Sequence, residues 1–158
     1  MTLEAETYDQ LFQRFLNAAH RIVEKKQVEA AQRMISDIQK EWRRRRDQGA
    51  TAVNFATPER GLLSALGYHV GHNQGQPSKL RRLILKYVLE GELPMVHSAE
   101  YMNEWSGPNS PARFQKLVRF LDNMIEGNYA KPNSQLAVKQ WREDRDWLEG
   151  YSRSDDES

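Results

Sequence analysis

The first 48 residues contain a long stretch without any helix-breaking residue. Neither glycine nor proline occurs between Glu4 and Gln48. Because these residue types are the strongest helix breakers, their absence over so long a stretch favours helix throughout it. Apolar residues recur there at steps of three or four, which is the spacing of one face of an α-helix. They are Leu11, Phe15, Ala18 and Ile22, and then Val28, Ala31, Ile35, Ile38 and Trp42.

The helical phase slips between Ile22 and Val28, across the polar segment Glu24–Gln27. We interpret the slip as a tight turn, which predicts two antiparallel helices and a helical hairpin over residues 1–48. One long helix with a phase slip is the alternative. Gly49 follows the pattern in the position of a C-terminal cap.

Beyond Gly49, helix starts and stops are marked by small residues. Serine and threonine side chains cap the first free amides of a helix, proline fits its first turn, and glycine ends it. Residues 52–55 form the one plausible extended stretch. The predicted helix starts are Thr57–Pro58, Pro77–Ser78, Ser98, Ser110–Pro111 and Ser134, and the stops include Gly67, Gly91 and Gly127.

These patterns predict an all-α fold. The hairpin at residues 1–48 is followed by a compact bundle of about five helices at 57–151 and by a disordered acidic tail at 152–158. They leave open whether the hairpin packs on the bundle or projects from it.

Composition narrows the class of protein further. The chain has 158 residues, a net charge of +1 and no cysteine, so disulfide scaffolds and thiolate metal sites are excluded. Its start is acidic, without a basic segment and an apolar run, and no stretch is long and apolar enough to span a membrane. We therefore expect a cytoplasmic protein with no membrane partner.

Several short motifs follow one another in a recognisable order after residue 62. They are Leu66–Gly71, Arg81–Leu85, Leu93–Pro94, Tyr101–Trp105 with Gly107–Pro108 and Ser110 after it, and Trp141 with Asp144 and Trp147–Leu148. In this order they resemble a small bacterial all-helical domain of uncharacterised function. The resemblance covers somewhat more than half of the chain. It implies a bacterial or phage accessory protein, and it brings no activity with it.

No complete catalytic signature is present. The stretch Gly67–Gly75 holds three glycines, but it lacks the Gly-Lys-Ser/Thr of a phosphate loop and follows a predicted helix. His69 and His72 lie three residues apart in this loop, without a carboxylate at a matching offset for a metal. We therefore predict a protein that is not an enzyme and that uses neither cofactor nor metal.

One acidic residue stands apart from its neighbours. Glu143 and Asp146 alternate with arginines, which is typical of a salt-bridged surface. Asp144 instead shares a helix face with Trp141 and Leu148. We expect it to be a buried or half-buried partner of an arginine or a backbone amide, in a structural role.

Our first hypothesis is a non-enzymatic binding or adaptor module that acts through protein–protein contacts. The second helix of the hairpin would present its apolar face to a partner or to a second copy of the chain. Among the aromatic residues, we expect Trp105 and Trp147 to be exposed. The predicted interface residues are Val28, Ala31, Ile35, Ile38 and Trp42.

The alternative is a nucleic-acid-binding protein that contacts phosphates through clustered basic residues, with strongly salt-dependent affinity. Each cluster has a structural explanation as well: cations at the end of a helix complement its dipole in the first cluster, and solvated helix faces account for the other two. The three clusters are Arg43, Arg44, Arg45 and Arg46, then Lys79, Arg81, Arg82 and Lys86, and finally Arg113, Lys116 and Arg119.

Overall fold

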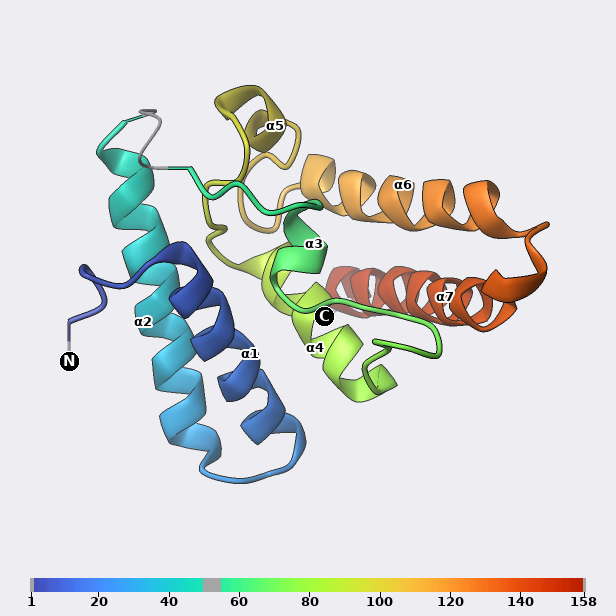
Figure 1. Ribbon diagram of the computed structural model, residues 1–158, viewed down its shortest axis with the longest axis horizontal. Coiled ribbons are helices and arrows are strands. Elements are labelled where there is room, and N and C mark those ends of the chain that lie inside the picture. The colour runs from blue at the N-terminus through green and yellow to red at the C-terminus, as the bar shows by residue number, and fades with distance from the viewer. Residues whose placement is uncertain (1, 50–54, 158) are drawn as a thin grey trace.

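The computed structural model describes residues 2–49 and 55–157, with side chains as far as Ser152. Within these residues it contains seven α-helices, a short 3-10 helix and no β-strand, which confirms the predicted all-α fold (Figure 1). None of the described helices combines the length and the apolar character needed to cross a membrane. The helices are α1 (Tyr8–Val23), α2 (Val28–Asp47), α3 (Leu62–Ala65), α4 (Ser78–Glu90), α5 (Ala99–Asn103), α6 (Pro111–Asn128), η2 (Pro132–Ser134) and α7 (Gln135–Glu157).

The N-terminal hairpin forms as predicted. Helices α1 and α2 pack side by side and are joined by a short connection (Figure 1). Within it, Lys25 and Gln27 have φ angles of 60° and 51°, in the left-handed region. Two left-handed residues so close together reverse the chain direction, and the alternative of one long helix is therefore wrong.

Capping side chains begin several of the helices. Thr7 and Gln10 form a reciprocal capping box at the start of α1. The hydroxyl groups of Ser98 and Ser110 accept hydrogen bonds from backbone amides in the first turns of α5 and α6. The serine signals thus locate the starts of these two helices correctly.

The predicted helix start at Thr57–Pro58 is wrong, since α3 begins at Leu62. Ala56, the residue before Thr57, forms backbone hydrogen bonds with the segment 95–97. This pairing keeps the chain extended there. The Leu62 amide then donates to the Tyr101 hydroxyl at 2.9 Å, so that a distant tyrosine caps α3. Of the expected extended stretch, residues 52–54 lie outside the described residues.

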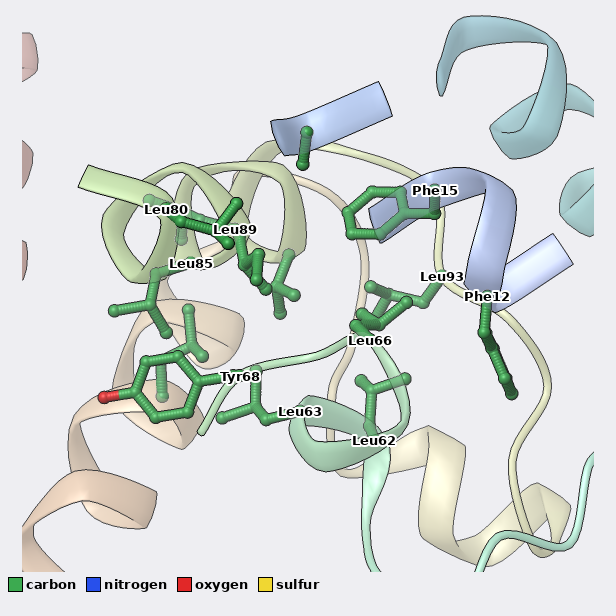
Figure 2. Close-up of a cluster of buried hydrophobic side chains, with 14 of the residues drawn as sticks. Phe12, Phe15, Leu62, Leu63, Leu66, Tyr68, Leu80, Leu85, Leu89 and Leu93 are labelled. Atoms are coloured by element: carbon green, nitrogen blue, oxygen red, sulfur yellow. The ribbon is translucent and has the colours of Figure 1, made fainter. Parts of the chain in front are cut away.

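The hairpin packs on the rest of the molecule through α1. The Phe15 ring lies 5.9 Å from the Trp42 ring of α2 and 5.9 Å from the Tyr87 ring of α4, measured between centroids. Buried side chains of all the long helices form one continuous cluster. Figure 2 shows part of it, with Phe15 of α1 directed toward the cluster of leucines.

The last helix is longer than the sequence predicted. Helix α7 continues to Glu157, whereas a disordered tail was expected from residue 152. No glycine or proline follows Gly150, so no strong helix breaker interrupts the chain there.

If hairpin and bundle share one core, truncating Ile38 should destabilise the whole chain. Ile38 is fully buried, and Ile38→Ala should lower the free energy of unfolding by about 2–5 kcal/mol. Urea unfolding followed by circular dichroism should still show a single transition. The exposed Arg43→Ala on the same helix is the control and should change stability by less than about 0.5 kcal/mol. Two separate transitions would contradict the shared core.

Candidate functional site

A cavity of about 450 Å³ lies between α3, the loop after it, α5, α6 and α7. Figure 1 shows α3 near the centre of the molecule, between the hairpin and the pair α6 and α7. The volume is within the range of roughly 300–1,000 Å³ that is usual for ligand pockets. Most of its wall is apolar or aromatic, and the aromatic side chains are Tyr68, Tyr101, Trp105, Phe120 and Trp141.

Trp105 contributes a buried side chain to this wall. It is only 2% exposed, and its indole N–H has no acceptor among the described residues. A buried donor without an acceptor is costly, and such groups usually have a partner. Because the nitrogen itself is closed off from solvent, this N–H is an unsatisfied group of the interior.

The burial of Trp105 corrects the expectation that it is exposed. The Arg113 guanidinium donates to the carbonyl oxygens of Trp105 and Ser106, at 3.1 and 2.7 Å. These bonds hold the turn against α6 and keep the indole inside. Trp147 is half-buried, and its ring stacks on Tyr151 at 5.2 Å between centroids.

The polar side chains of the cavity include two bases and no acid. Arg60 is exposed and His69 is half-buried, and both line the cavity, whereas no aspartate or glutamate does. Burial lowers the pKa of His69, and the positive charge of Arg60 lowers it further. The imidazole is therefore largely neutral at pH 7, and Arg60 carries the charge of this site.

One wall of the cavity is anchored by a buried polar network. Asp144 of α7 is fully buried and binds Arg81 of α4 through both carboxylate oxygens, at 2.7 and 3.1 Å. The Tyr68 hydroxyl donates to the same carboxylate at 2.6 Å, and Figure 2 shows this hydroxyl pointing away from the leucine cluster. The prediction that Asp144 is a buried partner of an arginine is confirmed.

The structure places most of the predicted protein interface inside the molecule. Ala31, Ile35, Ile38 and Trp42 are each at most 1% exposed, because α1 covers this face of α2. Val28, at the start of the helix, is half-buried. The first four side chains could reach a partner only if the hairpin opened, so we correct their assignment to a surface.

Three of the predicted phosphate-binding arginines are likewise buried and hydrogen-bonded within the chain. Arg45 binds Glu41 and the Glu6 carbonyl oxygen, at 2.5 and 2.6 Å. Arg81 belongs to the Asp144 network. Arg113 donates to four backbone carbonyl oxygens, and burial lowers its pKa to about 10.

The remaining basic residues divide into two groups. Arg44, Arg46 and Lys116 form ion pairs, and Arg82 lies 3.9 Å from the Asp144 carboxylate. The exposed residues Arg43, Lys79, Lys86 and Arg119 have no hydrogen bond or ion pair with any other residue that the structure describes. Because Arg45, Arg81 and Arg113 are buried, the structure does not present the three predicted clusters in full on its surface.

Comparison of the chain with protein-family models, with curated proteins and with solved structures finds no significant match. Within residues 2–49 and 55–157, no group of three or more histidines and carboxylates is arranged to hold a metal. The site has to be interpreted from its own geometry.

Sequence reasoning did not find this cavity. Its lining residues run from Arg60 to Trp141 and come from five separate segments, none of which carries a binding motif of its own. The closest signal is the motif Tyr101–Trp105, but the sequence predicts an exposed Trp105 rather than a buried wall. Convergence of distant segments depends on tertiary packing, which periodicity does not reveal.

The Tyr68–Asp144 hydrogen bond should make stability depend on pH in the alkaline range. Burial and the neighbouring carboxylate raise the pKa of Tyr68, so the folded chain keeps this proton while the unfolded chain loses it above pH 10. The contribution of this hydrogen bond to the free energy of unfolding is therefore complete below pH 10. Above pH 10 it decreases by about 1.4 kcal/mol per pH unit. Tyr68→Phe should be less stable than the original chain at pH 8, and this gap should narrow from pH 10 to 11.5 in urea unfolding experiments. A constant gap would contradict the assignment.

Proposed function

We propose that the chain is a non-enzymatic binding module that receives an aromatic or branched apolar group of a protein partner in the cavity. The observation that carries the proposal is the cavity itself, because most of its wall is apolar or aromatic. Protein interfaces depend on a few such anchors, usually large side chains that fill a desolvated pocket.

The lining favours an apolar occupant. Leu62, Leu63 and Met124 lie in the wall together with the aromatic rings, so a buried apolar group gains most of its binding energy from area removed from water. A large apolar side chain of a protein partner supplies such a group.

The titratable groups of the cavity support binding rather than catalysis. Acid–base chemistry needs a donor and an acceptor held together at suitable pKa values. His69 is the one histidine of the lining, and its charged neighbour there is Arg60, which is an acid far too weak for general acid–base catalysis near neutral pH. No carboxylate of the lining orients the imidazole as a third group would in a catalytic triad.

The geometry favours this cavity over the two surfaces expected from the sequence. The apolar face of the hairpin is already occupied by α1, and three of the predicted phosphate-binding arginines are committed to internal acceptors. Protein–protein contact therefore stays our proposal, with its place moved from the hairpin to the space between α3, α5, α6 and α7.

Filling the cavity should abolish binding of a neutral aromatic probe. We would titrate 3-phenylpropionamide, which has a ring and a carbonyl acceptor, and follow the indole N–H signals of the four tryptophans by NMR. The signals of Trp105 and Trp141 should shift most, because both side chains line the cavity. Ala137→Phe places a ring in the same space and should suppress these shifts.

The matched control is Ala30→Phe, which adds the same ring at an exposed position of α2. This variant should bind the probe as the original chain does. The proposal fails if the probe causes no shifts at millimolar concentration, or if Ala137→Phe folds and responds undiminished.

A further inference from the structure

We propose that the group received in the cavity is the C-terminal aromatic residue of a partner, with its α-carboxylate bound by Arg60 at the mouth. This inference rests on the proposed function and adds the chemical class of the ligand. It follows from the charge of the lining, from its aromatic rings and from the position of Arg60.

The charge of the lining selects an anion. Arg60 is the one permanently charged residue among the lining side chains, and no acidic side chain accompanies it. Its guanidinium has no ion pair or hydrogen bond with any side chain in the part of the molecule that the structure describes. Its backbone is held in place, since the His97 ring nitrogen Nε2 lies 3.0 Å from its carbonyl oxygen. A cation without a counter-charge attracts a carboxylate, which arginine binds through two parallel hydrogen bonds.

The position of Arg60 favours a chain end over a free small acid. Arg60 and Gln74 are exposed, whereas Trp105 and Trp141 are buried, so the charged group marks the mouth and the rings mark the interior. A C-terminal aromatic residue fits this order: its ring enters, its carboxylate stays at the rim, and the chain before it leads into solvent. Capture of a C-terminal carboxylate is a recurring mode of peptide recognition.

The test compares three probes by the Trp105 indole signal: the peptide acetyl-Gly-Ser-Gly-Phe as the free acid, the same peptide as the C-terminal amide, and 3-phenylpropionate. The free-acid peptide should bind about tenfold more tightly than the amide. Arg60→Gln should reduce this preference to less than about twofold while leaving binding of the amide unchanged. Arg60→Lys should retain part of the preference, because it keeps the charge and loses the two-pronged geometry.

Arg43→Gln is the matched control, since it removes an exposed arginine outside the cavity, and it should keep the full preference. Equal binding of the acid and the amide, suppressed for both by Ala137→Phe, would overturn the carboxylate contact and leave the proposed function standing. Tighter binding of 3-phenylpropionate than of the free-acid peptide would overturn the chain-end origin. Absence of binding by all probes would overturn both proposals.

Discussion

A buried pair of opposite charges, Arg81 and Asp144, joins α4 to α7 and determines where one wall of the cavity stands. The guanidinium binds both carboxylate oxygens and also the Gln76 carbonyl oxygen, at 2.7 Å, so it connects both helices to the loop before α4. The same carboxylate holds Tyr68. Removing one partner would leave a buried charge uncompensated, at a cost of about 3–5 kcal/mol, and the pair therefore allows one register of α7 against α4.

The long helices could be predicted because their signals are local. The capping serines before α5 and α6, the stepping of apolar residues in α1 and α2, and the phase slip at the hairpin turn all lie within a few residues of the feature that they predict. The start of α3 could not be predicted this way. It depends on Tyr101, which caps Leu62 from far along the chain and outweighs the local Thr57–Pro58 signal.

The cavity and the burial of some arginines could not be predicted from the sequence, for a related reason. Arg43 and Arg45 are two residues apart in one basic run, yet the first is exposed and the second lies buried against the Tyr8 ring. A guanidinium has five N–H donors and can satisfy several carbonyl oxygens at once, as Arg113 does. A run of charged residues in the sequence therefore does not reveal which of its side chains face solvent and which are buried. Asp144 was found because its helix neighbours Trp141 and Leu148 are apolar, and Arg45 was missed because its neighbours in the sequence are charged.

An occupant of the cavity would stabilise the whole folded chain. Its wall exists only when segments from Arg60 to Trp141 are packed together, so the unfolded chain has no counterpart of it. An occupant thus binds the native state alone, and its binding free energy adds to the free energy of unfolding. At a ligand concentration of a hundred times the dissociation constant, binding adds about 2.7 kcal/mol to the free energy of unfolding. The melting temperature would then rise with the ligand concentration, and it would report the fraction of molecules whose cavity is occupied.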